Sequence, residues 1–297
     1  MSCRLLYLVG QLGPGGLERQ LCYLLQAMDR ERYRPAVVVW NLREEDVYVA
    51  RIRALGVPVH GLPAIGAPAG KLRALRSVVK LLEPEIVHSY CFYLNFAAHF
   101  GVRDTRAFAL GSMRSDYILD KQSNPWWITA LSGRWPRHQI CNSVIAAENV
   151  RRSKSPFVPR RMVVVRNGID LRQFCTAPFR LNGRACLLGL GSLLPVKRWD
   201  RLLRAAQTLK QKGHDFVVRI GGGGPSHQSL EQLAHQLNLA DRVEFLGHID
   251  DVPRLLANAT FLVHTSDNEG CPNVLMEAMA CGRAVVATDA GDTPHLV

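Results

Sequence analysis

Short apolar runs alternate with longer stretches of helical character along the whole 297-residue chain. This alternation is typical of repeated β-α-β units, which fold into parallel sheets covered by helices on both faces. The runs that we interpret as strands form two series, and the pattern therefore predicts two doubly wound, Rossmann-like α/β domains that face each other across a cleft. The first series comprises residues 4–9, 36–40, 57–61, 85–88, 107–110, 138–141 and 162–165, and the second comprises 186–190, 216–220, 242–246, 261–264 and 284–287.

The stretch between the two series, residues 173–183, has neither a helical nor a strand period, and we interpret it as a linker. We therefore expect an N-terminal domain at residues 1–172, a linker at 173–183 and a C-terminal domain at 184–297. The chain is long enough for both, because a domain commonly spans about 100–200 residues.

Composition places the chain among globular proteins, with 47% hydrophobic and 21% charged residues. Its N-terminal apolar run, Leu5 to Val9, is too short for a signal-peptide core or a membrane span. The sequence therefore predicts a cytoplasmic protein. Eight cysteines without a Cys-x-x-Cys pair indicate buried, reduced thiols rather than a disulfide or zinc framework.

Basic charge is concentrated in the first part of the chain. Residues 1–170 contain 24 Lys and Arg against 13 Asp and Glu, whereas residues 171–297 contain 13 against 12. The asymmetry predicts an anionic partner, either the inner face of the membrane, where the protein would lie peripherally, or a phosphorylated acceptor. Nucleic acid is a weaker interpretation, because no helix-turn-helix, RNA-recognition or zinc pattern accompanies the charge.

Three tryptophans, Trp126, Trp127 and Trp135, lie among Lys121, Arg134 and Arg137. Aromatic and basic side chains together suit a membrane interface or a polyprenyl-linked sugar. Ordinary core packing of the tryptophans is the alternative that the sequence leaves open.

Two glutamates flank a predicted helix start near the end of the chain. Glu269 lies in a polar turn after the strand at 261–264, and Glu277 lies inside the helix-forming run 274–280, which Pro272 opens and Gly282 closes. A helix N-terminus offers free N–H groups and a partial positive charge, so a diphosphate bound there would have an acidic group on either side to accept hydrogen bonds from hydroxyls. Two solvated surface glutamates are the alternative.

Glycine-rich loops follow several of the predicted strands. Gly15 and Gly16 end a loop before a helix that begins near Leu17, and the four glycines at 221–224 end another strand. Such loops let backbone amides approach an oxyanion, although generic turns have the same composition. Lys197 and Arg198 precede a helix that begins near Trp199, and we expect both to point into the cleft, with two solvated surface cations as the alternative.

The stretch from Glu269 to Gly291 resembles the donor-site signature of retaining glycosyltransferases of the GT-B fold, the "glycosyl transferases group 1" family, of the family four type. The resemblance implies that Glu269 binds hydroxyls of the donor hexose and that Glu277 binds the ribose of the nucleotide. It also implies that the helix start at Asn273, Val274 and Leu275 meets the diphosphate. No metal is implied, since Asp267-Asn268-Glu269 has no further ligand in register.

Other segments extend the resemblance. Gly15, Gly16 and Glu18 resemble the family's Gly-Gly-x-Glu loop over donor phosphates and acceptor, and the spacing from Gly191 to Lys197 matches its phosphate-clamping lysine. Ser192 departs from the arginine common in that loop, and Arg198 is expected to replace its guanidinium. By the same resemblance Gly222, Gly223 and His248 line the base pocket.

Tyr90 stands on the acceptor side, where family members often have histidine. Its phenol can hydrogen-bond a hydroxyl but, with an ordinary pKa of about 10, cannot act as a base near neutral pH. His88 is expected to be a packed, hydrogen-bonded residue rather than a catalyst.

Together these features imply a retaining, metal-independent glycosyltransferase without a cofactor. It would move a hexose-type sugar from a nucleoside-diphosphate sugar to a saccharide or lipid-linked acceptor in polysaccharide or glycolipid biosynthesis, with Glu269, Lys197 and Arg198 as catalytic residues. A GT-B sugar-nucleotide epimerase and an inactive binding remnant remain alternatives. Family members continue beyond the position of Val297, so the second domain is expected to be incomplete, C-terminally shortened, with an unpaired sheet edge.

Overall fold

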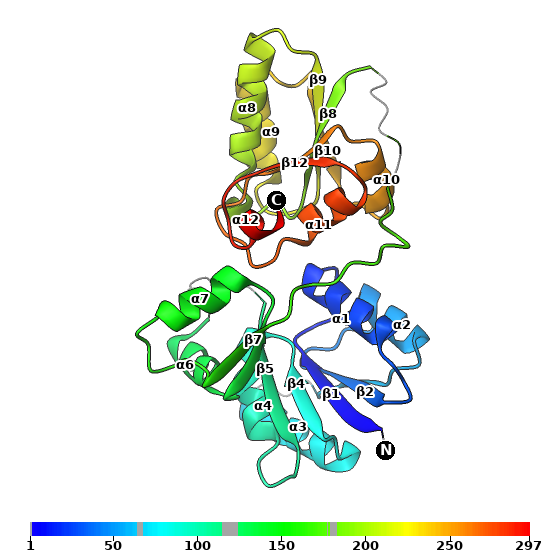
Figure 1. Cartoon of the computed structure of the whole chain (residues 1–297), viewed down its shortest axis with the longest axis vertical. Helices are drawn as coiled ribbons and strands as arrows, with labels where there is room; N and C mark the ends of the chain where they lie inside the picture. Colours follow the sequence, from blue (N-terminus) through cyan, green and yellow to red (C-terminus); the bar gives the residue numbers. More distant parts are fainter. Residues whose placement is uncertain (1, 64–67, 115–123, 177, 179–182) are drawn as a thin grey trace. The chain divides into compact units, whose positions relative to one another are not determined.

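A computed structural model describes residues 2–63, 68–114, 124–176, 178 and 183–297. The chain divides into two compact units, which differ in colour in Figure 1. We call Met1–Gly168 the first unit and Ile169–Val297 the second unit.

The first unit is built on a seven-stranded sheet of order β3-β2-β1-β4-β5-β6-β7, in which every pair of neighbouring strands is parallel. Because both faces of such a sheet are covered, its strands are continuously apolar rather than alternating, which is why the sequence shows them as short runs. The strands are β1 Cys3–Val9, β2 Tyr33–Val39, β3 Val59–Gly61, β4 Ile86–Ser89, β5 Phe108–Met113, β6 His138–Cys141 and β7 Arg161–Val164.

Helices cover both faces of this sheet (Figure 1). Side chains from α1 and α2 pack with alternate residues of β1 and β2, including Tyr7 and Val9, in one apolar cluster. Residues of α3 and α4 pack with the intervening residues, including Leu6 and Leu8, in a second cluster on the opposite face. The helices are α1 Gly16–Ala27, α2 Val47–Ala54, α3 Pro68–Leu82, α4 Asn95–Gly101, α6 Trp126–Arg134 and α7 Val144–Arg152.

The second unit repeats this layering on a five-stranded parallel sheet of order β10-β9-β8-β11-β12. Helices α8 and α9 cover one face and α10 and α11 the other. The strands are β8 Ala185–Leu190, β9 Phe216–Gly221, β10 Val243–Gly247, β11 Phe261–His264 and β12 Ala284–Ala287. The helices are α8 Trp199–Gln211, α9 His227–Gln236, α10 Val252–Ala257, α11 Asn273–Ala280 and α12 Thr293–Leu296.

Strand order reverses once in each unit. In the first unit the chain returns after β3 to the free side of β1 with β4, and in the second it returns after β10 to the free side of β8 with β11. Loops diverge at such a switch point, and ligands of open α/β sheets bind there, at the carboxyl ends of the strands. The loops after β1 and β4 and those after β8 and β11 are therefore the places where the fold favours a ligand.

The expectation of two α/β units with parallel sheets is confirmed, and each predicted strand has a counterpart whose ends differ by at most three residues. The expected linker lies partly outside the described residues, and Phe174, at its start, is 2% exposed and packs in the core of the second unit. All eight cysteines are free, and Cys175 is exposed rather than buried. No helix among the described residues is long and apolar enough to cross a membrane.

Candidate active site

The loop after β8 is held in place by Trp199, the first residue of α8. The indole Nε1 donates to the carbonyl of Ser192 at 3.0 Å, and the buried ring lies so close to Gly189 that a Cβ there would meet it at 2.6 Å. A single 3-10 turn, Pro195–Lys197, then presents Lys197 to the carboxyl edge of the sheet. Trp199 thus fixes the backbone conformation of this loop through its contacts with Gly189 and Ser192.

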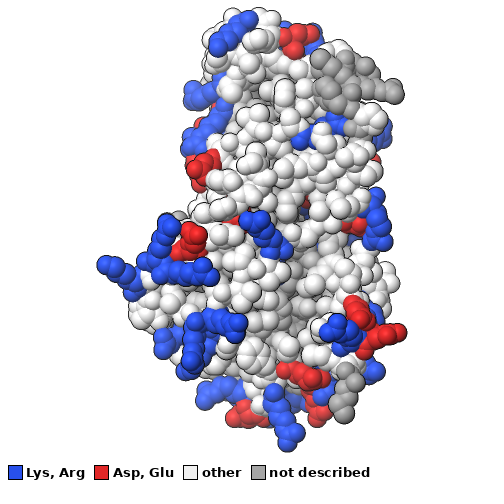
Figure 2. Space-filling view, viewed as in Figure 1, with Lys and Arg blue, Asp and Glu red and all other residues white. Residues whose placement is uncertain are grey.

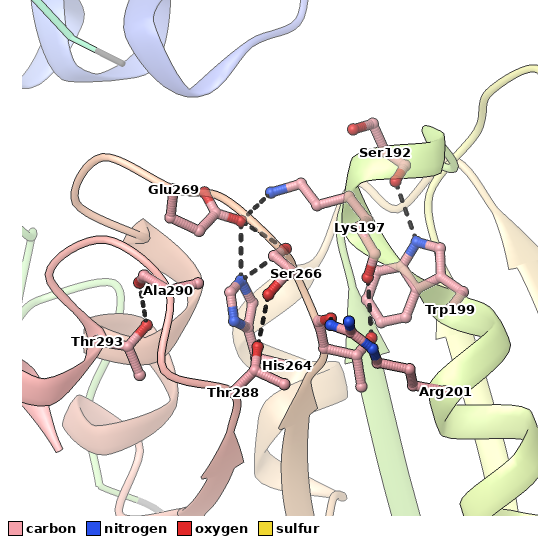
Figure 3. Close-up of polar contacts among 11 residues, drawn as sticks. Ser192, Lys197, Trp199, Arg201, His264, Ser266, Glu269, Thr288, Ala290 and Thr293 are labelled. Carbon is pink, nitrogen blue, oxygen red and sulfur yellow. Dashed lines mark hydrogen bonds and ion pairs between the residues drawn. The ribbon is translucent and has the colours of Figure 1, made fainter. Parts of the chain in front are cut away.

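Three donors converge on one oxygen of Glu269, in the loop after β11 (Figure 3). Lys197 Nζ lies 2.5 Å from Glu269 Oε1, Ser266 Oγ donates to it at 2.7 Å, and His264 Nε2 lies at 2.9 Å. Lys197 comes from the β8 loop, whereas the other two belong to the β11 segment. The pair Lys197–Glu269 therefore bridges the switch point of the second unit.

The electrostatics of Glu269 follow from this arrangement. Burial alone raises the pKa of a carboxyl group, but the hydrogen bond from His264 and the charge of Lys197 outweigh it and lower the pKa of Glu269 to about 2. The side chain is only 13% exposed. At neutral pH Glu269 is thus a buried carboxylate that accepts hydrogen bonds and is a very weak base.

The second glutamate of the signature, Glu277, lies one turn inside α11 and is 4% exposed. Neither Glu269 nor Glu277 is therefore a solvated surface residue. Asn273 and Val274 open the helix, while the side chain of Leu275 is fully buried in the core, so only its backbone faces the helix start.

Glycines pack the loops after β8 and β9 against each other. Gly222 has φ +140°, and a Cβ there would lie 1.9 Å from the carbonyl oxygen of Gly191. At Gly223 a Cβ would meet nothing within 4 Å. Gly222 is thus required by the packing, and Gly223 leaves open space beside its backbone.

Arg198 is engaged by two carboxylates. Its guanidinium bonds Asp200 at 3.0 and 3.1 Å and Asp267 at 3.0 Å, and Arg201 also pairs with Asp267 at 2.6 Å. A phosphate would have to compete with both aspartates for Arg198. In the described part of the chain, no group of three or more His, Cys, Asp or Glu side chains could hold a metal ion.

Two further predicted donor residues lie at the surface. The side chain of His248, after β10, is 72% exposed and faces Asp250, with 3.4 Å between Nε2 and Oδ1. Ser192 is exposed and contributes its carbonyl to Trp199.

At the switch point of the first unit, Tyr90 follows β4 and is 2% exposed. The guanidinium carbon of Arg114, which follows β5, lies 4.0 Å from the centre of its ring. His88 Nε2 lies 2.8 Å from Ser112 Oγ, and burial, with a smaller effect of Arg114, lowers the pKa of His88 to about 3. His88 is therefore a packed neutral residue, as expected from the sequence.

Glu18 lies in the first turn of α1 and folds back over the loop after β1. A Cβ on Gly15 would meet its Oε2 at 2.1 Å, so the carboxyl group occupies the space beside Gly15. Burial, and then the charge of Asp46, raise the pKa of Glu18. An oxyanion at the start of α1, next to Gly15 and Gly16, would have to displace this group.

The residues that hold Glu269 and Lys197 in place, namely His264, Ser266 and Trp199, were not predicted from the sequence. In the sequence His264 reads as the last residue of an apolar strand, and Trp199 as the start of a helix. The available signal was position, because polar residues at the carboxyl end of a parallel strand lie where ligands bind.

The comparison with known families covers most of the chain. Residues 14–173 match Glycosyltransferase Family 4. Residues 178–297 match Glycosyl transferases group 1.

Two curated relatives illustrate the similarity. One subunit of the human phosphatidylinositol N-acetylglucosaminyltransferase is 31% identical over 162 residues, 54% of this chain and 33% of that protein. The gpi3 subunit of the corresponding Schizosaccharomyces pombe enzyme is 26% identical over 300 residues, 96% of this chain and 65% of that protein. The chain thus spans less than two thirds of the length of these relatives.

Among solved structures, Anabaena HepE in complex with UDP and glucose superposes with a TM-score of 0.81 at 22% identity, over 99% of this chain and 82% of that one. This likeness shows that the fold is GT-B. With more than half of its residues matched by one family, the chain belongs to Glycosyltransferase Family 4.

Proposed function

We propose that the chain transfers a hexose-type sugar from a nucleoside-diphosphate sugar to a saccharide or lipid-linked acceptor, with retention of anomeric configuration. The observation that carries this proposal is the Lys197–Glu269 pair, which sets a cation and a buried carboxylate side by side at the switch point of the second unit. The cation can stabilise the charge of a leaving diphosphate, and the carboxylate can accept hydrogen bonds from the hydroxyls of a sugar.

In this proposal Lys197 contacts the diphosphate and its contact strengthens as the leaving group gains charge. Glu269 accepts hydrogen bonds from the sugar, and Glu277 accepts them from the ribose. The backbone at Asn273 and Val274, at the start of α11, faces the phosphates. Arg198 takes part only if a phosphate draws it away from Asp200 or Asp267.

The bond between the anomeric carbon and the phosphate oxygen breaks, and a bond to the acceptor oxygen forms on the same face of the sugar. The proton of the acceptor hydroxyl passes to a phosphate oxygen of the leaving group. This route is supported by the low pKa of Glu269, since a carboxylate with a pKa of about 2 is poorly suited to remove that proton. Neither a protein nucleophile nor a metal ion enters the step.

The acceptor side belongs to the first unit in this proposal, at Tyr90 and Glu18. Arg114 over the Tyr90 ring has no carboxylate partner among the described residues, and its charge suits an acceptor that has a phosphate. The two curated relatives are named for phosphatidylinositol, a lipid, which agrees with a lipid-linked acceptor.

The test is to incubate the chain with UDP-, GDP- and ADP-sugars, with and without polyprenyl-phosphate-linked and free saccharide acceptors, in the presence of EDTA. We expect an α- or β-linked product of unchanged anomeric configuration, detected by mass spectrometry and proton NMR, only when an acceptor is present. Lys197→Ala should lower turnover at least ~100-fold, whereas Lys212→Ala, at the exposed end of α8, should not. Turnover of the donor without acceptor would indicate an epimerase, and donor binding without turnover would indicate a binding protein.

We further propose that the first unit contacts an anionic membrane surface. The carboxyl ends of α4, α6 and α7 and the amino ends of β6 and β7 gather basic residues that we call the basic edge, and Figure 2 shows Lys and Arg over this side of the unit. Contacts join its parts, since the amide of Arg161 donates to the carbonyl of Arg137 at 2.9 Å and Arg134 Nη1 donates to the carbonyl of Pro156 at 2.8 Å. The basic edge comprises Arg103, Arg134, Arg137, Arg151, Arg152, Lys154, Arg160 and Arg161, all exposed.

Its charge is barely compensated. Among the described residues, only Arg152 of the basic edge pairs with a carboxylate, that of Glu148 at 3.1 Å. Phe157 lies exposed within the edge, and Trp126, 79% exposed, begins α6. Trp135, by contrast, stacks on His99 with 5.5 Å between ring centres, and Trp127 packs edge-on against Phe96 with 5.9 Å between ring centres. Two of the three tryptophans therefore pack against other rings.

Co-sedimentation with vesicles of phosphatidylcholine alone or with phosphatidylserine tests the membrane contact. Binding should require phosphatidylserine, weaken as salt rises, and fall in Arg160→Glu/Arg161→Glu. The matched variant Arg204→Glu/Lys212→Glu, which changes exposed residues of the second unit, should bind as the wild type does. Equal binding by all three proteins, or preference for a nucleic acid over vesicles at the same salt, would contradict the proposal.

A further inference from the structure

His264 is the last residue of β11 and the most buried member of the Glu269 cluster, with 2% of its surface exposed. Its Nε2 lies 2.9 Å from Glu269 Oε1 and 3.3 Å from Ser266 Oγ (Figure 3). Its Nδ1 is buried and has no hydrogen-bond partner among the described residues. Among the described residues, the side-chain polar contacts of the imidazole are therefore made by Nε2, with the shorter one to the glutamate.

The carboxylate of Glu269 determines which ring nitrogen of His264 is protonated. A carboxylate has no proton to give, so Nε2 must be the N–H that donates to Glu269. The other neutral tautomer, with the proton on Nδ1, would leave a buried N–H without an acceptor and would turn the lone pair of Nε2 toward the carboxylate. The geometry thus selects the imidazole tautomer that donates from Nε2.

All three donors in the cluster meet at Oε1, and no described residue hydrogen-bonds Oε2. The carboxylate is therefore fixed through one oxygen and leaves the other open. Lys197 belongs to another loop and acquires a second anionic partner when a diphosphate binds. His264 and Ser266 precede Glu269 by only five and three residues and belong, like Glu269, to the β11 segment.

We propose that His264 is a positioning residue that, with Ser266, fixes Glu269 through Oε1 so that Oε2 faces a hydroxyl of the donor sugar. This inference rests on the proposed function, because it assumes that the second unit binds a nucleotide sugar. It assigns His264 to the recognition of the sugar and not of the nucleotide. Loss of the imidazole should consequently weaken the sugar-dependent part of donor affinity alone.

Calorimetric titration separates these parts with three pairs of probes: UDP and UDP-glucose, UDP and UDP-N-acetylglucosamine, and GDP and GDP-mannose. For the pair that the wild type binds best, His264→Leu should weaken binding of the nucleotide sugar at least ~10-fold and leave that of the free diphosphate within about twofold. His264→Gln, whose amide can donate from a similar position, should restore most of the difference. His214→Leu, an exposed histidine after α8, is the matched control.

Crystal structures of the His264→Leu and His264→Gln variants provide a second test, which needs no bound ligand. Glu269 should adopt a different rotamer in His264→Leu and keep its rotamer in His264→Gln. An unmoved Glu269 in the Leu variant, or equal weakening of diphosphate and sugar nucleotide, would overturn the inference. Wild-type protein that binds none of these diphosphates or nucleotide sugars would instead refute the proposed function.

Discussion

Replacing Glu269 by Gln removes a charge whose contribution to stability can be derived from its pKa. Gln keeps the shape of the side chain and an oxygen for the three donors, but not the negative charge opposite Lys197. The carboxyl pKa falls from 4.5 to about 2 in the folded chain, and this difference corresponds to about 3 kcal/mol of stability at pH 7. The side chain is only 13% exposed, so solvent screens the interaction little.

The sign of the pH dependence follows directly. Because the folded pKa of Glu269 is depressed, the stabilisation is fully present above the ordinary value of 4.5 and is lost as the pH falls toward 2. The difference in unfolding free energy between wild type and Glu269→Gln should therefore be about 3 kcal/mol at pH 7 and at pH 5, and about half of that near pH 3. Other carboxyl groups titrate alike in both proteins and cancel from the difference.

Urea unfolding followed by circular dichroism at pH 7, 5, 4 and 3 measures this difference. Glu231→Gln, which alters an exposed glutamate of α9 beside His227, is the control and should change stability by no more than about 0.5 kcal/mol. A difference for Glu269→Gln below about 1 kcal/mol at pH 7, or one that does not shrink with acid, would show that the cluster does not hold a buried carboxylate.

Three further predictions concern the backbone and the nucleotide. Gly222→Ala should abolish nucleotide binding and lower the melting temperature by several degrees, since its Cβ would collide with the carbonyl of Gly191, whereas Gly223→Ala should be tolerated. Ser143→Ala removes the side-chain cap of α7 and should cost about 1 kcal/mol in chemical denaturation. Glu277→Gln should weaken binding of a free nucleoside diphosphate in calorimetry, because the proposed contact is with the ribose; unchanged affinity would return Glu277 to a purely structural role.

The strands were predictable because burial on both faces turns them into apolar runs. Two strand ends differ by three residues from the prediction, the start of β2 and the end of β5. The error at the start of β2 has a local cause. Pro35 argues against a strand, since it has no N–H for the ladder. In the structure β3 begins to pair only opposite Val37, so Pro35 lies on an edge where no partner needs that N–H, while β1 pairs with it on the other side.

The position of Lys197 and Arg198 in the loop before α8 was predictable from spacing, but their interactions were not. Lys197 and Arg198 are adjacent, and the sequence predicts that both point into the cleft, yet the left-handed backbone at Arg198, φ +51°, separates the directions of their side chains. Lys197 meets Glu269, and Arg198 meets Asp200 and Asp267. Which carboxylate pairs with which cation depends on how the loops after β8 and β11 pack, and that information lies in long-range contacts rather than in local sequence.

The two switch points differ in their ionisable groups, and the difference bears on the chemistry. On the first unit, burial lowers the pKa of His88 to about 3 and raises the pKa values of Tyr7, Tyr90 and Tyr93, so none of these four groups gains or loses a proton near neutral pH. Burial raises the pKa of Glu18 in the same unit, so this carboxyl group takes up a proton at a higher pH than an exposed glutamate does. In the second unit the pKa of Glu269 is lowered instead. A carboxylate that stays ionised and a histidine that stays neutral agree with the proposed mechanism, in which a phosphate of the substrate takes the acceptor proton. In that proposal, Glu18 is the side chain through which pH would act on the acceptor.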